Sequence, residues 1–264
     1  ELVGSERLGK AVGLMEMLTM VGILGGAFLG AYAFDQLVEE RGGWEAGFIV
    51  CTFISILAFL SWIISAPIPD TQFSAKKPFR YSLIVSHFHD LVYLFNSKGL
   101  RYASLGDAWF WAVGGFFYLV LVKLSGEVVS GKVGMGTLYG YWFLLLGIGT
   151  MLGSLCAAFL NRGRVEIGLT VIGGLGMPVV FMGLAFLDPL TNYFDFLCLC
   201  LGIFGALFFV PLNGYLQDKA EKNERGRVLA ASNLLTQLSG ILLVLIHALL
   251  SNILKFSAKE ELLI

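Results

Sequence analysis

Charged residues are scarce in this sequence, and their scarcity is the first constraint on what the protein can be. Asp, Glu, Lys and Arg make up 14% of its 264 residues, whereas a soluble domain carries about 25%. Hydrophobic residues make up 57%, and the mean hydropathy is +0.79. The 18 Lys and Arg residues are spread over several loops without a basic stripe, so we expect no nucleic-acid partner. The composition indicates a membrane protein.

Cysteine is also scarce, and its placement argues against metal binding. All four cysteines lie inside apolar runs, where a thiol usually packs as a small hydrophobe. Cys198 and Cys200 are two residues apart and would point to different faces of a helix. His87 and His89, next to Asp90, diverge in the same way, and polar side chains on a solvated face are the plainer interpretation. We expect no metal and no cofactor.

Signature motifs of several membrane-protein classes are missing. The last apolar run has no lysine in its middle, which a retinal-type receptor requires. Ser104-Leu105-Gly106-Asp107 lacks the first glycine of the Gly-x-Gly-Asp motif of intramembrane aspartyl proteases, and no Gly-x-Ser-x-Gly elbow is present. No segment resembles a cleavable signal peptide. These gaps favour a transporter over an enzyme or a receptor.

Long apolar runs are what the sequence has in abundance. A bilayer core about 30 Å thick requires about 20 apolar residues in a helix, and about seven runs of this size are present. They are Ala11 to Phe34, Trp44 to Ala66, Ala103 to Leu124, Gly136 to Leu160, Val165 to Leu187, Tyr193 to Tyr215 and Val228 to Leu254. The sequence therefore predicts an all-α polytopic membrane protein.

The charges between the runs predict orientation and organisation, because short cytoplasmic loops are enriched in Lys and Arg. The basic loops are the opening segment, the connection 67–101, the turn with Arg162 and Arg164, and the segment with Arg225 and Arg227. Two helices before a long loop and five after it fit a transporter of two six-helix halves. Residues 1–66 would end the N-terminal half, 67–101 would form a central cytoplasmic loop with an amphipathic helix, and 102–264 would form a C-terminal half without its last helix.

The two ends of the sequence suggest a longer polypeptide. The chain opens on Glu1 rather than Met. It closes on a charged step followed by Leu262, Leu263 and Ile264, which resembles the start of another apolar run. We expect further helices at both ends.

Several short blocks resemble known permeases. The segment from Gly153-Ser154 to Arg162-Gly163-Arg164 resembles the second-half copy of the glycine and arginine loop signature of the major facilitator superfamily. Other blocks resemble the lysophospholipid transporter family and the permease region fused to acyltransferase and acyl-carrier-protein synthetase modules. These blocks are Glu1 to Val3, Glu6 to Ala11, Gly13 to Met17, Trp109 to Gly114, Gly163 to Leu169, Val210 to Asn213 with Gln217, and Glu224 to Val228 with Ala231 and Asn233.

The resemblance implies helices five to eleven of twelve and an alternating-access permease of the bacterial inner membrane. It implies a lysophospholipid substrate, with ethanolamine as the expected headgroup, moved toward the cytoplasmic leaflet for reacylation. The chain itself would not be an enzyme, although an acyltransferase could be fused or adjacent to it. A generic exporter of drugs or small metabolites and a membrane anchor for a fused acyltransferase stay open as alternatives, which headgroup dependence and the activity of the permease region would separate.

Carboxylates inside the apolar runs are the first candidates for substrate binding, because a charge in the membrane is costly and usually faces a cavity or a partner. Glu16 and Asp107 both lie inside runs. Glu16 could equally form an ion pair with nearby Arg7 or Lys10. Asp107 is followed by Trp109, and a carboxylate beside an indole can receive a cationic headgroup. The same aromatic residues could instead anchor the helix at the membrane interface.

Amides and arginines complete the candidate set. Asn213 with Gln217, and Asn233 with Gln237, are spaced four apart, so each pair shares a helical face and could bind a phosphate and glycerol or join helices. We expect Asp107, Trp109, Asn213, Asn233, Gln237 and Glu16 to bind the substrate. Arg162, Arg164, Arg225 and Arg227 could form a cytoplasmic gate whose ion pairs exist in one conformation, or simply fix topology. Gly22, Gly26 and Gly30, and likewise Gly149 and Gly153, offer smooth faces for helix packing.

Overall fold

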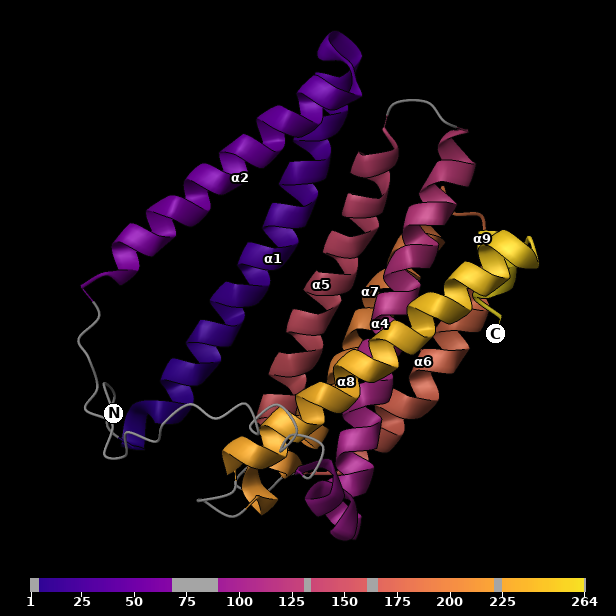
Figure 1. Cartoon of the computed structure of the whole chain (residues 1–264). Helices are drawn as coiled ribbons and strands as arrows, with labels where there is room; N and C mark the ends of the chain where they lie inside the picture. The colour runs from indigo at the N-terminus through magenta and orange to yellow at the C-terminus, as the bar shows by residue number, and fades with distance from the viewer. Residues whose placement is uncertain (1–4, 68–89, 131–133, 161–165, 221–224, 264) are drawn as a thin grey trace. The chain divides into compact units, whose positions relative to one another are not determined.

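The computed structural model describes residues 5–67, 90–130, 134–160, 166–220 and 225–263, with the side chains of residues 5–21, 217 and 225 left out. All regular structure in these ranges is helical, which confirms the all-α prediction (Figure 1). The helices are α1 (Ser5–Arg41), α2 (Gly43–Ser65), α4 (Lys98–Val129), α5 (Met135–Leu160), α6 (Gly168–Phe186), α7 (Asn192–Lys219), α8 (Arg225–Ala248), the π-helical η1 (Leu249–Ile253) and α9 (Ala258–Glu261).

Six helices in the described ranges are long and apolar enough to cross a membrane. They are α2, α4, α5, α6, α7, and α8 together with η1. Each contains most of one predicted apolar run, and α4 extends beyond its run, Ala103 to Leu124, at both ends. The first predicted run, Ala11 to Phe34, lies within α1, where side chains are described from Gly22 onward.

The chain forms two compact units. One comprises residues 1–79 and 129–144, and the other comprises residues 80–128 and 145–264. The first described part of α5 therefore belongs to one unit and its remainder to the other. These boundaries follow contacts within the chain. They do not test the predicted division into two transporter halves and a central loop at residues 66 and 101, which stays a prediction.

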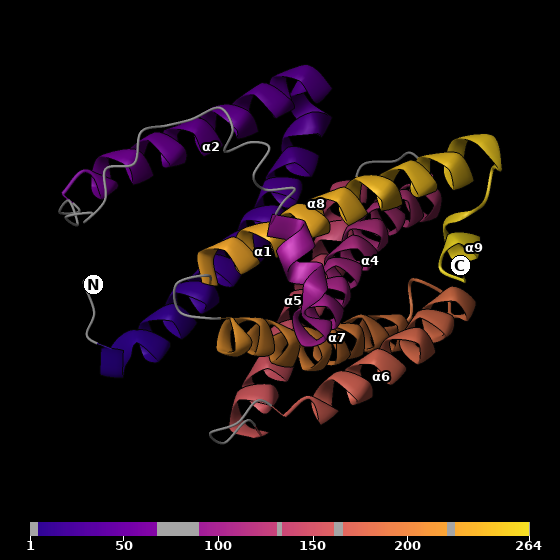
Figure 2. The ribbon, with the colours of Figure 1, turned by 60° about the horizontal axis from the view of Figure 1, so that its bottom comes forward.

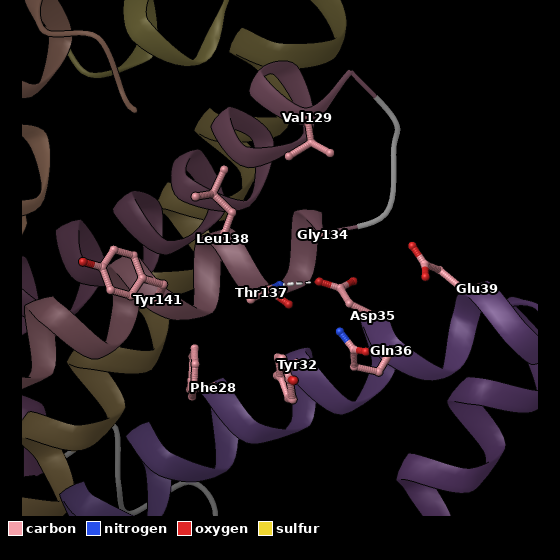
Figure 3. A pocket seen from close by; sticks show the side chains of 10 residues that line it. All are labelled: Phe28, Tyr32, Asp35, Gln36, Glu39, Val129, Gly134, Thr137, Leu138 and Tyr141. Carbon is pink, nitrogen blue, oxygen red and sulfur yellow. Dashed lines mark hydrogen bonds between the residues drawn. The ribbon is translucent and has the colours of Figure 1, made fainter. Parts of the chain in front are cut away.

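In the first unit, α1 and α2 form a hairpin (Figure 1). Gly42 makes the turn with a φ of 79°, a backbone conformation in which a residue with a side chain would be strained. The start of α5 is held by α1, because the Asp35 carboxylate accepts a hydrogen bond from the Thr137 backbone N–H (Figure 3). Thr137 lies in the first turn of α5, whose N–H groups have no acceptor within the helix. Asp35 thus acts as an N-cap supplied by another helix.

Glycines bring helices together in the second unit. A Cβ atom built on Gly149 of α5 would lie 2.0 Å from the Leu199 carbonyl oxygen of α7, and one on Gly153 would lie 2.5 Å from that of Ile203. This confirms the predicted Gly149 and Gly153 face. At Gly22, Gly26 and Gly30 no described atom lies within 4 Å of the Cβ position, so the packing expected there is absent from the described structure. α6 and α7 also run side by side (Figures 1 and 2).

An apolar cluster joins one end of α4, α7 and α8. Leu94, in the short helical stretch 90–96, is fully buried with Leu100, Leu212, Leu216 and Val228. This stretch is the described end of the predicted amphipathic helix, and Leu94 within it packs against protein. His87 and His89 lie outside the described residues.

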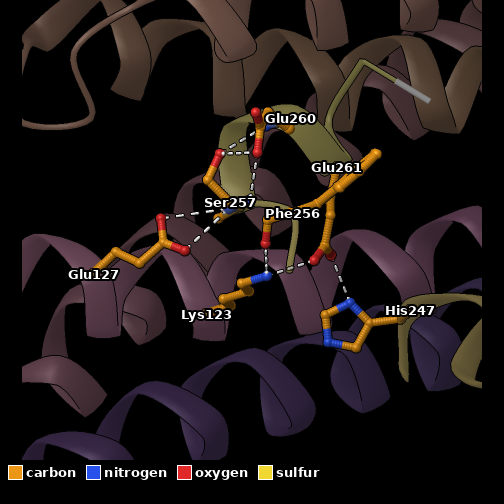
Figure 4. A network of polar contacts seen from close by, with 8 residues as sticks. Lys123, Glu127, His247, Phe256, Ser257, Glu260 and Glu261 are labelled. Atoms are coloured by element: carbon orange, nitrogen blue, oxygen red, sulfur yellow. Dashed lines mark hydrogen bonds and ion pairs between the residues drawn. The ribbon is translucent and has the colours of Figure 1, made fainter. Parts of the chain in front are cut away.

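At the other end of α4, a buried carboxylate joins three segments (Figure 4). One Glu261 carboxylate oxygen lies 2.6 Å from Lys123 Nζ of α4, and the other lies 2.7 Å from His247 Nδ1 of α8. The Glu261 side chain is completely buried, and Lys123 also donates to the Phe256 carbonyl. Because unpaired charges are costly in such a place, this cluster fixes the turn after η1 against α4 and α8.

The short helix α9 begins with a capping box. Ser257 Oγ accepts from the Glu260 backbone N–H, and the Glu260 carboxylate accepts from the Ser257 backbone N–H at 2.7 Å. The Ser257 backbone N–H and hydroxyl hold the pKa of the exposed Glu260 carboxyl below its usual range. Glu127 of α4 accepts from the Ala258 N–H at 3.0 Å, so α4 contacts this turn twice.

We expect Gly149→Ala to destabilise the helical bundle. The added methyl group would overlap the Leu199 carbonyl, and overpacking of this kind costs roughly 1–3 kcal/mol. Thermal unfolding of the full-length protein in detergent would report a lower Tm. Gly240→Ala is the matched control, because no described atom lies within 4 Å of its Cβ position. Equal Tm values for the two variants would contradict the close contact between α5 and α7.

Glu261→Gln should lower stability far more than the adjacent Glu260→Gln. The first change leaves Lys123 and His247 facing a neutral group inside the protein, and breaking a buried pair costs about 3–5 kcal/mol. The second change removes a carboxylate from the surface. Comparing denaturant unfolding of the two variants tests the difference, and similar losses would mean that the buried pair contributes little.

Candidate functional site

A cavity of about 530 Å³ lies between α4, α7 and α8 in the second unit. Its lining carries one carboxylate, three amide side chains and a hydroxyl. The lining residues are Asp107 and Trp111 of α4, Phe209 and Asn213 of α7, and Asn233, Thr236, Gln237 and Gly240 of α8. The cavity therefore gathers polar groups between three apolar helices, where a polar ligand could be held.

Asp107 is the centre of this polar group. Its side chain is 7% exposed, and its Oδ2 accepts hydrogen bonds from the hydroxyls of Ser232 at 3.2 Å and Thr236 at 3.4 Å. Trp111, one helical turn after Asp107 on α4, lines the same cavity. Oδ1 has no partner at hydrogen-bond distance among the described residues. Oδ2 is thus held by two hydroxyls, whereas Oδ1 is buried without a compensating hydrogen bond in the described structure.

The charge of Asp107 is not balanced by the lining. Every other lining residue is neutral and carries no titratable group. A carboxylate at this depth in a bilayer costs several kcal/mol unless a counter-charge or water reaches it. The cavity can therefore attract a cationic group, while its amides can donate to and accept from polar groups such as phosphate and hydroxyl.

Most of the residues expected to bind substrate come together here. Asp107, Asn213, Asn233 and Gln237 line the one cavity, although they come from three helices separated by long stretches of sequence. The sequence alone suggested their individual roles without showing that they meet. Gln217 lies on α7, but its side chain is outside the described part.

Trp109 is the predicted substrate-binding residue of α4 that does not line this cavity. The structure places Trp111, and not Trp109, in the cavity lining. The Trp109 ring instead packs edge to face on Phe208 of α7, with the centroids 5.4 Å apart. Trp111 follows Asp107 by four residues and so shares its helical face, a signal that was present in the spacing. Trp111 in turn packs on Phe209, also at 5.4 Å.

Ser232 and Thr236 are the polar residues that the candidate set omitted. They are four residues apart on α8 and direct their hydroxyls to the same carboxylate oxygen. Their shared spacing was visible in the sequence, but hydroxyl residues are common in membrane helices. Only the approach of α4 distinguishes them.

Among the remaining candidates, the structure describes the side chain of Arg227 alone. Glu16 lies in α1, and Arg225 begins α8, but neither side chain is described; Arg162 and Arg164 are outside the described residues. Arg227 is described, and its Nη2 lies 2.7 Å from Oδ1 of Asp90. Its guanidinium also lies over the Tyr93 ring, 5.3 Å from the centroid. Arg227 thus ties the start of α8 to the stretch before α4.

A second cavity, of about 590 Å³, lies in the first unit between α1 and the start of α5 (Figure 3). Asp35 and Glu39 contribute carboxylates to its lining, Gln36 contributes an amide, and Phe28, Tyr32 and Tyr141 contribute aromatic rings. Since Asp35 already caps α5, its burial has a structural explanation.

Comparison with known proteins places the chain among membrane transporters. The sequence model of the Major Facilitator Superfamily matches residues 1–244. The lysophospholipid transporter LplT of Klebsiella pneumoniae (strain 342) is 28% identical over 257 residues, which cover 94% of this chain and 60% of that protein. LplT of Photorhabdus laumondii is 28% identical over 259 residues, 96% of this chain and 61% of that protein.

The Cronobacter sakazakii LplT is 29% identical over 240 residues, covering 89% of this chain and 56% of its own length. The chain therefore spans about three fifths of the relatives that it matches. The match of the superfamily model to nearly the whole sequence, together with six apolar helices of spanning length, shows a multi-pass membrane protein that belongs to the Major Facilitator Superfamily.

Proposed function

We propose that the protein is an alternating-access permease that moves a lysophospholipid, with lysophosphatidylethanolamine as the preferred substrate, across the bacterial inner membrane. The observation that carries the proposal is the cavity around Asp107, found in a chain whose matched relatives are named lysophospholipid transporters. The direction is toward the cytoplasmic leaflet, where reacylation consumes the substrate. An acyltransferase, fused or adjacent, would be the partner in that step.

The chemistry of the cavity suits such a headgroup. The ethanolamine ammonium is a cation with three N–H donors, and the Asp107 carboxylate is a charged acceptor in the lining of the cavity. The Trp111 indole on the same wall favours a cation by its ring face. Amide groups of Asn213, Asn233 and Gln237 can donate to the phosphate and accept from the glycerol hydroxyl. The headgroup thus exchanges its water for groups already in place.

The proposed organisation follows the superfamily. Residues 1–66 would supply helices five and six, residues 67–101 the central cytoplasmic loop, and residues 102–264 helices seven to eleven. Alternating access then moves one half against the other around a site near the bilayer midplane. Asp107, Asn213 and Asn233 all fall in the C-terminal half, so that half would carry the headgroup site.

Arg227 and Asp90 are proposed to form part of the cytoplasmic gate. Their ion pair joins the central loop to the start of α8 in this conformation. An ion pair that exists in only one of two conformations biases the equilibrium between them. Arg162, Arg164 and Arg225, on loops predicted to face the same side, are proposed as its neighbours.

Asp107→Asn should reduce uptake of labelled lysophosphatidylethanolamine by about 10- to 100-fold, since a hydrogen bond to a charged group contributes roughly 1.5–3 kcal/mol. The measurement uses the full-length protein in spheroplasts that lack their own transporter, at equal membrane abundance. Asp35→Asn, the same change at a carboxylate that caps α5, is the control and should keep most of the uptake. Unchanged uptake in Asp107→Asn would limit Asp107 to a structural role.

Charge exchange tests the gate. Arg227→Asp and Asp90→Arg alone should each slow transport, because each places like charges together at the contact. The double variant should recover much of the rate if the pair itself sets the conformational equilibrium. The measurement is the transport rate of the two single variants and the double variant. If the loss of rate in the double variant equals the two single losses combined, the ion pair is not part of the gate.

A further inference from the structure

The end of α1 and the start of α5 meet in a narrow seam within the first unit (Figure 3). A Cβ atom built on Gly136 of α5 would lie 3.0 Å from Oδ1 of Asp35. One built on Gly140 would lie 3.4 Å from the Cβ atom of Ala31. These two glycines are four residues apart and so share a face of α5. Because they have no side chains, α1 can approach the α5 backbone this closely.

Asp35 closes the seam at the first turn of α5. The residue is 6% exposed, and its carboxylate accepts from the Thr137 backbone N–H. The first N–H groups of a helix have no acceptor within it, and the peptide dipoles concentrate partial positive charge there. A carboxylate at this place is stabilised without a basic side chain as its partner. The bond therefore lasts only as long as α1 stays against α5.

The predicted topology puts this seam at the outer side of the membrane. The reason is that α1 follows the basic opening segment, and α5 precedes the basic turn with Arg162 and Arg164. In the proposed organisation α1 is helix five and α5 is helix eight, so they come from opposite halves. Nearer the start of α1, no described atom lies within 4 Å of the Cβ positions of Gly22 and Gly26. The close contact described for α1 and α5 is therefore at their outer ends.

We propose that this seam is the outer closure of the permease, held by Asp35 as a removable helix cap, and that it parts when the outer side opens. The inference rests on the proposed function, since only a transporter of two halves has to separate helix five from helix eight. A cap of this kind suits a contact that is repeatedly made and broken. When α1 withdraws, water reaches both the carboxylate and the first N–H groups of α5, so neither is left buried without a partner.

The first experiment needs no lipid substrate. A cysteine in place of Ala31, which is 8% exposed, reports access to the seam in the full-length protein, with its other cysteines replaced, in detergent. Asp35→Leu removes the cap, so a hydrophilic maleimide should label this cysteine several-fold faster than without the change. Asp35→Asn is the matched control and should stay slow, because asparagine caps a helix about as well as aspartate. Equal labelling with and without Asp35→Leu overturns the closure, and so does fast labelling of Asp35→Asn.

The second experiment locks the seam and leaves Asp35 unchanged. Ala31→Cys together with Gly140→Cys places two Cβ atoms 3.4 Å apart, close to their separation in a disulfide. In spheroplasts, oxidation should cross-link the pair and abolish uptake of lysophosphatidylethanolamine, and reduction should restore it. Each single variant should transport equally well under both conditions. A pair that does not cross-link, or a cross-linked protein that still transports, overturns the closure.

The two experiments separate the closure from the proposed substrate. If the labelling rates change as expected but neither the parent nor the reduced double variant takes up lysophosphatidylethanolamine, the closure stands and the proposed substrate is wrong. If uptake is present and the cross-link leaves it intact, the proposed substrate stands and the closure is wrong.

Discussion

A charge within a bilayer must be paired or neutralised, and this constraint organises the second unit of the chain. Two of its buried carboxylates, Glu261 and Asp107, each contact α8 and illustrate the two outcomes. Glu261 contacts Lys123 of α4 and His247 of α8, so both of its carboxylate oxygens have partners within the protein. Asp107 of α4 accepts from two hydroxyls of α8, and its second oxygen is buried without a hydrogen-bond partner among the described residues. The first carboxylate is suited to holding the structure together, and the second lines the cavity proposed to receive the headgroup.

Close packing of α5 against α7 in the same unit depends on glycines. Gly149 of α5 meets α7 through backbone atoms, and a Cβ on Gly202 of α7 would lie 2.0 Å from the Leu146 carbonyl of α5. Helices in lipid gain little from apolar burial against one another, so close backbone approach supplies much of their attraction. Tight packing of α5 and α7 leaves α7 a firm wall from which Asn213 reaches the cavity.

Sequence reasoning predicted the helices well and the site in part. Apolar runs of about 20 residues have few structural alternatives, because every backbone polar group in lipid must be bonded within the segment. Asp107 could be singled out from the sequence because a carboxylate inside an apolar run is costly whatever its neighbours in the fold are. The sequence could not show that Trp111 rather than Trp109 lines the cavity, since the direction of a cavity depends on which neighbour approaches the helix. The Lys123, His247 and Glu261 cluster was missed because its members are joined only by tertiary structure.

The late position of Glu261 has a consequence for membrane insertion. Lys123 is separated from its carboxylate by 138 residues, which include α5, α6, α7 and α8. During synthesis, α4 therefore enters the membrane with an unpaired ammonium at its end, and His247 follows in the same condition. The bundle can close there only after residue 261 has left the ribosome. A chain arrested before that point would hold Lys123 of α4 and His247 of α8 without the carboxylate that joins them.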